Sequence, residues 1–333
     1  MVLVTGATGI LGRVIVLELL KQGRTVRATH RKNSDLQEVR KSFAYYTDEP
    51  EDYFQRIEWA ETDFEDLQAL EAALHGVSEV YHCSGKVSFY PQDRQELIRT
   101  NTEGTKNLLY ACEGSSVQKF LFVSSVAVLD GFNEDGFLDE TSDYNPKIPH
   151  SYYAKSKHFS EMEVSRASAE GLNTIIVNPG IIIGSGNWQA SSGELFSTLE
   201  RYPYAMGGTT SYVDVRDVAR ISVDLMNNNR FGERFILMSE NRSYLSFSEQ
   251  VRSKLGKSLP KVLSATVLTA GYVLNILLGW LFPRLRLLNK INIATVTGNS
   301  PVSNKKIKTL GYEFIPVSES IDFHLKNYQN RDK

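Results

Sequence analysis

The stretch Thr5-Gly6-Ala7-Thr8-Gly9-Ile10-Leu11-Gly12 directly follows a short apolar run that we interpret as the first β-strand. Its three glycines permit a tight turn, close approach of a pyrophosphate to the backbone, and close packing of the helix that follows. The amino terminus of that helix adds N–H donors and the positive end of its dipole. Because the glycines lie between a strand and a helical pattern, we predict that residues 5–12 bind a dinucleotide; the alternative is a merely structural turn.

Short β-rich runs alternate with helical patterns through the first half of the chain. The predicted strands are 2–5, 25–29, 57–60, 79–82, 120–123 and 174–177, and helices such as 66–75 and 101–112 lie between them. This alternation requires crossover connections, which place helices on both faces of a parallel sheet. The sequence therefore predicts an α/β protein with a doubly wound parallel sheet.

The pattern changes after Pro179, where five glycines interrupt a loop-rich region before a predicted helix at 213–227 and a strand at 235–238. We therefore predict two domains. The dinucleotide-binding domain comprises residues 1–179 plus about 212–239. A smaller, discontinuous substrate-binding domain comprises about 180–211 plus 240–333.

The composition excludes several classes of protein. The 333 residues are 41% hydrophobic and 23% charged, which is ordinary for a globular enzyme-sized chain. Thirty-seven Lys and Arg nearly balance 39 Asp and Glu without forming a basic stripe, so we expect no nucleic-acid partner. Cys83 and Cys112 have no Cys/His cluster nearby, so we expect a reducing compartment and no metal site. No signal-peptide core precedes the glycine-rich turn, so we expect a cytoplasmic location.

The second predicted strand ends at Thr29-His30-Arg31-Lys32, where dinucleotide-binding folds place the residue that contacts the adenosine ribose. An acidic side chain there favours NAD, whereas cations suit the 2′-phosphate of NADP. Arg31 and Lys32 therefore predict NADP(H), and solvated loop charges are the alternative. Asp63, after the third strand, can receive the adenine amino group or lie on the surface.

The stretch Tyr153-Ala154-Lys155-Ser156-Lys157 begins a predicted helix. A spacing of i, i+4 places the Tyr153 phenol and the Lys157 ammonium on one face. We expect the cation to lower the phenol pKa from about 10, which makes Tyr153 a proton donor or acceptor near neutral pH. Tyr152 competes for this role, but the residue four positions after it is Ser156.

Ser124 and Ser125 follow the fifth predicted strand, at the sheet edge where open parallel sheets bind ligands. A hydroxyl there can hydrogen-bond a substrate carbonyl, and a local capping role is the alternative. None of His82, His150 and His158 is spaced for a metal, so we expect them to be packed or solvated.

Taken in order, these motifs resemble those of the extended short-chain dehydrogenase/reductase family across essentially the whole chain. The matching stretches are TGATGILG (5–12), Asp63, YHCSG (81–85), NTEGT (101–105), FVSSV (122–126), YAKSK (153–157), NPGIIIG (178–184), YVDVRDVA (212–219) and LGY (310–312). VRATHR at 26–31 and an apolar helix near the carboxyl terminus are most similar to the dihydroflavonol reductase and 3β-hydroxysteroid dehydrogenase branch. The resemblance implies a Rossmann-like fold.

The resemblance also implies roles for individual residues. Ser125, Tyr153 and Lys157 match the catalytic positions, and Asn101 matches an asparagine that steadies a proton relay through the lysine. The implied cofactor contacts beyond residues 5–12 are Arg31, Lys32, Asp63, Phe64, Cys83, Ser84, Gly85, Tyr153, Lys157, Pro179 and Gly180. Cys83-Ser84-Gly85 departs from the small apolar residues that many relatives carry there.

The resemblance implies reduction of a ketone or aldehyde with NADP(H), or the reverse oxidation, on an apolar, flavonoid- or steroid-like small molecule. NAD(H) is the alternative cofactor. The alternative functions are a nucleotide-sugar epimerase or dehydratase that keeps NAD bound, and a noncatalytic dinucleotide sensor. A homodimer is compatible with the sequence.

Residues 262–282 contain no charged side chain, and their length would allow a membrane span. Polar residues and glycines dilute the stretch, and Pro260 and Pro283 bound it as they would an ordinary helix. We therefore expect either a buried wall of the substrate pocket or a helix on a membrane surface, with Trp280 and Arg284 as peripheral contacts.

Overall fold

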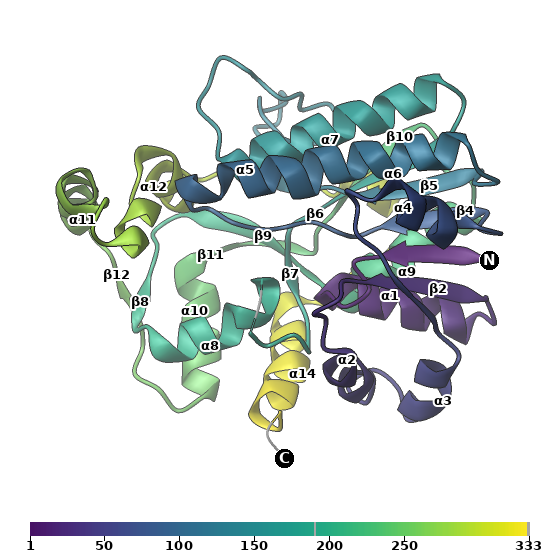
Figure 1. Ribbon diagram of the computed structural model, residues 1–333. Helices are drawn as coiled ribbons and strands as arrows, with labels where there is room; N and C mark the ends of the chain where they lie inside the picture. The colour runs from purple at the N-terminus through teal and green to yellow at the C-terminus, as the bar shows by residue number, and fades with distance from the viewer. Residues whose placement is uncertain (190, 332–333) are drawn as a thin grey trace.

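The computed structural model describes residues 1–189 and 191–331, and its centre is a seven-stranded parallel sheet (Figure 1). The strands are β1 (Val2–Thr5), β2 (Val26–His30), β3 (Glu58–Glu61), β4 (Glu79–His82), β5 (Lys119–Val123), β6 (Asn173–Pro179) and β10 (Glu233–Leu237). Their order in the sheet is β10-β6-β5-β4-β1-β2-β3. The chain reverses its direction of winding between β1 and β4, as in doubly wound folds. The predicted Rossmann-like α/β fold is confirmed.

Residues alternate between two cores on the two faces of this sheet. Val2 and Val4 of β1 pack with α1 (Ile10–Lys21) and α9 (Val215–Asn227). Leu3 lies in the opposite core, with α4 (Leu67–Leu74), α6 (Gly104–Glu113) and α7 (Tyr152–Ala169). Since both faces of each strand are buried, the strands are almost continuously apolar, as the sequence shows. Helices α2 (Leu36–Phe43) and α3 (Pro50–Gln55) follow β2.

A second group of elements lies beside the central sheet (Figure 1). Strands β7 (Ile181–Ile183), β9 (Thr209–Asp214) and β11 (Glu240–Ser243) form a three-stranded sheet, and β8 (Tyr204–Ala205) pairs with β12 (Lys261–Val262). A separate apolar core joins this sheet to α8 (Leu195–Arg201), α10 (Tyr244–Lys254) and α14 (Val317–Gln329). The division into two domains stays a prediction.

Two predicted helices start at other residues than we expected. Residue 213 belongs to β9, and α9 begins at Val215 because the Asp214 carboxylate accepts a 2.8 Å hydrogen bond from the backbone N–H of Arg216. The segment predicted as a helix over 101–112 starts inside a π-helical turn, Ile98–Glu103, which joins α5 (Arg94–Leu97) to α6. Hydrophobic periodicity does not distinguish π from α geometry over a single turn.

The apolar stretch 262–282 forms α11 (Ala265–Leu278), followed by the 3-10 turn Pro283–Leu287 and α12 (Lys290–Thr297). Leu268 is the one buried residue of α11, so the expectation of a buried pocket wall is wrong. Among residues 1–189 and 191–331, no helix is long and apolar enough to cross a membrane. The chain then returns to the central sheet through α13 (Lys305–Thr309), whose Ile307 is part of the core around α1.

Candidate active site

The predicted site residues gather where the strands of the central sheet end. Parallel strands expose their carboxyl ends at one edge of a sheet, so the turns after β1, β4, β5 and β6 lie together. Gly6, Ser84, Ser125 and Gly180 each lie in one of these turns. The site therefore combines residues from four segments far apart in the sequence.

The glycine-rich turn after β1 is closely packed. Gly6 has φ of +64°, and a Cβ atom there would lie 2.7 Å from the backbone nitrogen of Ser84. A Cβ atom at Gly12 would clash with the carbonyl oxygen of Gly6, and the Gly9 N–H donates to the same oxygen at 2.9 Å. Gly9 is the residue before α1 and has no side chain that could accept from the first N–H groups of the helix. These N–H groups therefore suit an anionic ligand. The turn thus fits the pyrophosphate of a dinucleotide.

The side chains of this turn point mainly into the protein. Ile10 and Leu11 are buried in the core of α1, whereas Thr8 is half-buried. Thr5 is buried, and its hydroxyl lies 2.7 Å from Nδ1 of His82. Any contact of this turn with a phosphate is therefore expected from the backbone rather than from these apolar side chains.

Arg13 is a functional neighbour that sequence reasoning missed. Its buried guanidinium donates to the carbonyl oxygens of Thr8 and Gly9 and forms a bidentate pair with Glu38, at 2.9 and 2.7 Å. Glu38 also accepts a 2.6 Å hydrogen bond from the backbone of Asn187. The sequence did contain a signal for this role, because Arg13 is a charged residue within the otherwise apolar run that forms the first half of α1. Arg13 ties the glycine-rich turn to α2 and to the loop after β7.

The structure exposes both cations at the end of β2. Arg31 and Lys32 lie on the surface, and in the described part of the chain neither side chain forms a salt bridge. Asp63 is exposed and accepts a 3.0 Å hydrogen bond from the N–H of Glu65, whereas Phe64 packs against His82. Contacts of these four residues with an adenosine stay predictions.

His82 is a packed histidine, as we expected. Its ring lies between two hydroxyl groups, that of Thr5 at 2.7 Å and that of Thr105 at 2.9 Å. Desolvation lowers the pKa of the ring to about 3. The neutral ring therefore joins β4 to β1 and α6. Next to it, desolvation raises the pKa of the Cys83 thiol to about 12, so this cysteine remains protonated.

Tyr153 and Ser125 lie in direct contact. Ser151 caps α7 by accepting a 3.1 Å hydrogen bond from the N–H of Ala154, which directs Tyr153 into the protein. Burial raises the pKa of the Tyr153 phenol, and its hydrogen bond with the Ser125 side chain partly opposes that rise. Tyr152 points elsewhere, with the Arg94 guanidinium 5.3 Å from its ring centre. The geometry therefore favours Tyr153 over Tyr152.

Ser125 and Ser124 differ in their surroundings. Ser125 is half-buried, whereas Ser124 is buried and its hydroxyl has no hydrogen-bond partner among the described residues. The Ser125 hydroxyl also accepts a 3.2 Å hydrogen bond from the N–H of Ala127. Only Ser125 combines access from solvent with contact to Tyr153.

Lys157 is buried one turn further along α7. Its ammonium donates a 2.7 Å hydrogen bond to the carbonyl oxygen of Val123 and lies 4.6 Å from the centre of the Phe122 ring. Desolvation lowers its pKa to about 8. The expectation that Lys157 lowers the Tyr153 pKa is not met in this geometry, because burial of the phenol dominates and Ser125 is the group that opposes it.

Asn101 lies in the π-helical turn, close to Lys157. A Cβ atom at Gly85 would lie 3.3 Å from the Lys157 nitrogen and 3.5 Å from the Asn101 side-chain oxygen. The side-chain oxygen of Asn101 accepts a 2.7 Å hydrogen bond from the N–H of Lys86. Its side-chain nitrogen donates to the carbonyl oxygen of Lys86 and to the hydroxyl of Ser156, both at 2.9 Å. Asn101 thus fixes the loop after β4 against α7, and its role in a proton relay stays a prediction.

A buried polar network behind the catalytic candidates was not visible in the sequence. Glu161 lies one turn after Lys157 and accepts hydrogen bonds from Asn178 at 2.8 Å and from Arg234 at 2.6 Å. Asn178 also donates a 3.0 Å hydrogen bond to the carbonyl oxygen of Ser125. The network therefore connects α7, β6 and β10 to the backbone of Ser125.

Two further features border the catalytic candidates. Phe89 is 45% exposed and its ring contacts that of Tyr153 edge to face, with centroids 5.9 Å apart. Pro179 ends β6, and a Cβ atom at Gly180 would lie 2.6 Å from the carbonyl oxygen of Ser211. Phe89 therefore supplies an apolar surface beside the phenol, whereas Gly180 allows the chain to pass close to β9.

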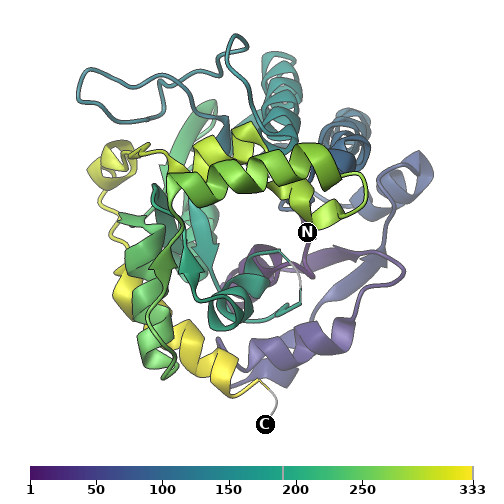
Figure 2. The same cartoon turned by 90° about the vertical axis from the view of Figure 1, so that its left-hand side faces the viewer.

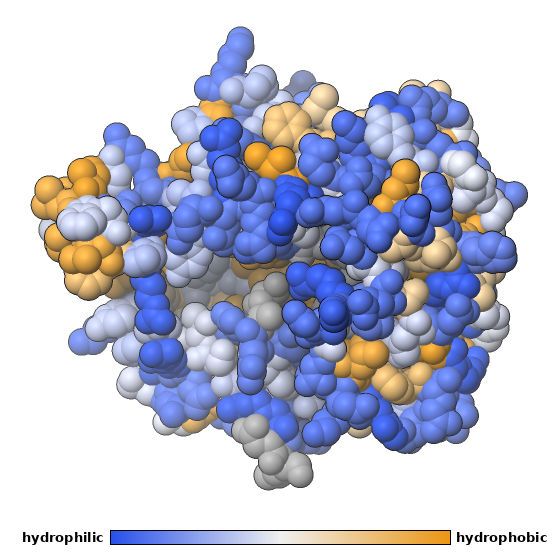
Figure 3. Space-filling view, in the orientation of Figure 1, coloured by the Kyte–Doolittle hydropathy of each residue, from blue (hydrophilic) through white to orange (hydrophobic). Residues whose placement is uncertain are grey.

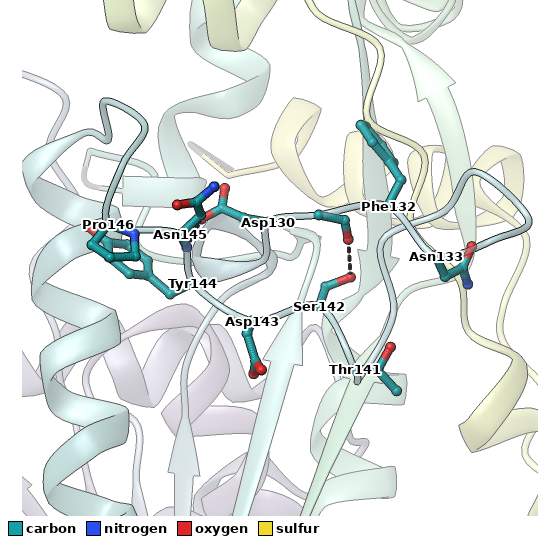
Figure 4. A pocket seen from close by; sticks show the side chains of 10 residues that line it. Asp130, Phe132, Asn133, Thr141, Ser142, Asp143, Tyr144, Asn145 and Pro146 are labelled. Atoms are coloured by element: carbon teal, nitrogen blue, oxygen red, sulfur yellow. Dashed lines mark hydrogen bonds between the residues drawn. The ribbon is translucent and has the colours of Figure 1, made fainter.

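An open depression of about 440 Å³ lies on the loop that joins the 3-10 turn Val126–Val128 to α7 (Figure 4). Its lining includes Asp130, Ser142 and Tyr144, and Tyr144 also stacks on His158 with ring centroids 3.9 Å apart. None of Ser125, Tyr153 and Lys157 lines it.

The residues that the structure describes include no cluster of His, Cys, Asp and Glu that could hold a metal ion.

The fold and this site define a dinucleotide-binding enzyme with a tyrosine and a lysine at the carboxyl edge of a doubly wound sheet. A profile of the NAD dependent epimerase/dehydratase family matches residues 2–237. The chain belongs to this family, in its extended short-chain dehydrogenase/reductase branch, whose members are NAD(P)-dependent enzymes that act on CH–OH or C=O groups.

Individual proteins are similar over most of the chain. Sterol demethylase protein B of Methylococcus capsulatus is 29% identical over 277 residues, which cover 82% of this chain and 80% of that protein. A putative dihydroflavonol 4-reductase of Synechocystis is also 29% identical, covering 78% of this chain and 73% of the relative. The crystal structure of gox2253 superposes with a TM-score of 0.82 at 26% identity and covers 99% of this chain and 98% of that one.

Proposed function

We propose that this chain is an NADP(H)-dependent oxidoreductase that reduces a ketone or aldehyde group of an apolar small molecule, or oxidises the corresponding alcohol. The observation that carries the proposal is the contact between Tyr153 and Ser125, with Lys157 buried one helical turn further along α7. The three groups lie at the ligand-binding edge of the sheet, next to the glycine-rich turn. In this proposal residues 180–211 and 240–333 provide most of the substrate contacts.

The preference for NADP(H) rests on the end of β2. Arg31 and Lys32 are exposed there, and a guanidinium or ammonium group can pair with a 2′-phosphate. The ribose hydroxyls of NAD(H) would instead favour an acidic acceptor at this position. The closely packed glycines after β1 accommodate the pyrophosphate that both cofactors share.

The chain's own residues supply the proton chemistry. When bound, the nicotinamide supplies or accepts the hydride. The raised pKa of Tyr153 keeps its phenol protonated at neutral pH, so the phenol can donate a proton to the oxygen of the carbonyl being reduced. Ser125 holds that phenol and can donate a hydrogen bond to the same oxygen. The Lys157 ammonium binds the Val123 carbonyl oxygen in this structure, and in this proposal it turns toward Tyr153 during the reaction, where its charge stabilises the phenolate left after proton transfer.

The proposed substrate is flat and apolar, of sterol or flavonoid type. Two of the similar proteins carry sterol and dihydroflavonol in their names. In this chain the exposed ring of Phe89 lies edge-on to Tyr153, where it would contact the carbon skeleton next to the reacting carbonyl. An apolar ring at this point favours a substrate with little hydration around its reacting group.

The deciding experiment measures NADPH oxidation with a panel of steroidal, flavonoid and aliphatic carbonyl compounds. We expect turnover with at least one polycyclic ketone, and none in the Tyr153→Phe variant. A nucleotide-sugar epimerase would instead retain NAD through purification and interconvert sugar nucleotides without net oxidation. Binding of NADPH without turnover of any carbonyl would leave a dinucleotide sensor and overturn the proposal.

A further inference from the structure

Helix α11 and the turn after it carry an exposed apolar surface. The side chains of Ile276 and Leu277 are each 61% exposed, and Trp280 is 74% exposed. Leu281 and Phe282 continue this surface beyond the end of the helix, each 53% exposed. In the space-filling view, orange side chains gather at the left edge of the molecule, where α11 lies in the same orientation (Figure 1 and Figure 3). An exposed apolar patch of this kind marks an interaction site.

The charged residues next to this surface in the sequence have one sign. Residues 262–304 contain no Asp or Glu, and their three charged residues, Arg284, Arg286 and Lys290, directly follow the apolar surface. The complete chain has a formal charge of −2, so this segment is positive within a slightly acidic protein. The partner of this surface is therefore expected to be apolar and anionic together.

We propose that α11 and the turn 279–290 dock on the surface of an anionic lipid bilayer. The 14 residues of α11 span about 21 Å, too short for a hydrocarbon core of about 30 Å, so the helix lies in the plane of the interface. Its aliphatic side chains enter the boundary between headgroups and acyl chains. Trp280 occupies the headgroup level, and Arg284 and Lys290 contact anionic headgroups.

Contacts within the segment hold this surface in place. A Cβ atom at Gly271 would lie only 2.7 Å from a methyl carbon of Leu288. The turn therefore packs closely against α11. The Arg286 guanidinium donates a 2.8 Å hydrogen bond to the carbonyl oxygen of Gly279, and Asn275 donates to the Leu288 carbonyl at 3.2 Å. The apolar surface is thus part of a folded hairpin formed by α11, the turn and α12.

The hairpin also connects to the candidate active site. Asn292 of α12 donates a 2.9 Å hydrogen bond to the carbonyl oxygen of Phe89, whose ring contacts Tyr153. Figure 2 shows α11 across the front of the molecule. If the proposed function holds, docking brings Phe89 and the candidate active site toward the lipid surface in which an apolar carbonyl compound would dissolve.

A second copy of the chain is a poorer occupant for this surface. In a symmetric dimer the same patch meets itself, so the cations of one copy would face those of the other. No acidic residue of the segment is available to neutralise them, and like charges across an interface oppose association. Anionic lipids neutralise the same cations, which is why the observations favour a membrane.

The test is sedimentation of the full-length protein with vesicles, which does not depend on turnover. We expect binding to phosphatidylcholine vesicles that contain about one third phosphatidylserine, at least tenfold weaker binding to phosphatidylcholine alone, and weakening by salt. The double variant Ile276→Ser/Leu277→Ser should lose at least tenfold in binding. Its matched control is Leu67→Ser/Phe132→Ser, which removes two exposed apolar side chains elsewhere.

A second pair of variants tests the charge. Arg284→Gln/Lys290→Gln should weaken binding to the anionic vesicles, whereas Lys41→Gln/Lys147→Gln, which removes two exposed cations elsewhere, should not. Cofactor binding should be unchanged in all four variants, which shows that they are folded. The proposal is overturned if the wild-type protein does not bind anionic vesicles, or if Ile276→Ser/Leu277→Ser converts a dimer to a monomer without affecting vesicle binding.

Discussion

Lys157 and Gly85 approach so closely that a methyl group on Gly85 would lie 3.3 Å from the lysine ammonium. The glycine therefore leaves room for Lys157 to be buried at the end of β4, where desolvation lowers its pKa to about 8. This value lies within the range in which an enzyme can be assayed.

The first prediction concerns the pH dependence of the reductase reaction. Lys157 is protonated below about pH 8, and raising the pH through this value removes the charge that stabilises the phenolate. The pKa of Tyr153 is raised, so the phenol itself loses its proton only at higher pH. We expect kcat/KM for reduction to fall above about pH 8, measured with saturating NADPH. A profile that stays flat up to pH 10 would contradict the role of Lys157.

Replacement of the phenol gives the second prediction. Tyr153→Phe removes the proton donor, and loss of general acid catalysis typically costs about 10²-fold to 10⁴-fold in kcat. Cofactor affinity should change little, as measured by fluorescence titration with NADPH. Tyr152→Phe is the matched control, because the Tyr152 ring faces the Arg94 guanidinium and does not contact Ser125. Loss of activity only in Tyr152→Phe would move the catalytic role by one residue.

The third prediction concerns cofactor choice. A charged contact with the 2′-phosphate contributes about 1.5–3 kcal/mol, so Arg31→Ala/Lys32→Ala should weaken NADPH binding by roughly 10-fold to 150-fold. NADH binding should be nearly unchanged. Lys41→Ala, an exposed cation on α2, serves as the control. Equal affinities of the wild-type protein for the two cofactors would show that Arg31 and Lys32 point into solvent.

A fourth prediction addresses stability. Arg234 pairs with Glu161, whose side chain is only 4% exposed, and removing the guanidinium leaves that carboxylate buried without its partner. Arg234→Met should lower the free energy of unfolding by about 2–4 kcal/mol, measured by chemical denaturation. Lys305→Met breaks the exposed pair with Asp135, which solvent screens, and should cost much less. Similar losses in the two variants would show that Glu161 is not effectively buried.

The fifth prediction is a loss of stability in acid. The pKa of His82 is about 3 in the folded chain and near 6.5 when unfolded, so the unfolded state binds more protons between these values. Stability should therefore fall as the pH is lowered from about 6.5, by up to about 1.4 kcal/mol per pH unit from this residue. His82→Gln should flatten the dependence. An unchanged slope in that variant would assign the effect to other groups.

Local patterns allowed most of the fold to be predicted. The glycines of residues 5–12 and the alternation of apolar strands with helices identify the doubly wound sheet, since both are readable within a few residues. The spacing from Tyr153 to Lys157 likewise placed both residues on α7. Helix starts were less accurate, because Asp214 ends one element and caps the next.

The remaining site residues depend on contacts between distant segments. Arg13 and Glu38 are 25 positions apart, Glu161 and Arg234 are 73 apart, and Asn292 contacts Phe89 across 203. A single sequence does not show which distant polar residues will meet. The pKa of Tyr153 was mispredicted for a related reason, because helical spacing gives the position of Lys157 but not the direction of its ammonium.

The α11–α12 hairpin is bounded by two backbone attachments. At one end the N–H of Leu263 donates to Ala205 at 3.0 Å, and at the other Leu138 exchanges hydrogen bonds with Pro301 and Ser303 at 2.9 and 2.8 Å. Close to the second attachment, the N–H groups of Gly208 and Thr209 donate to the carbonyl oxygens of Val296 and Gly298 at 3.1 and 3.0 Å, and Asn292 donates to Phe89. Residues 264–291 therefore form a module that is attached to the scaffold on both sides. Such a module can diverge in length and polarity while the sheet and the catalytic candidates keep their positions, so related enzymes could acquire new substrates by exchanging this segment alone.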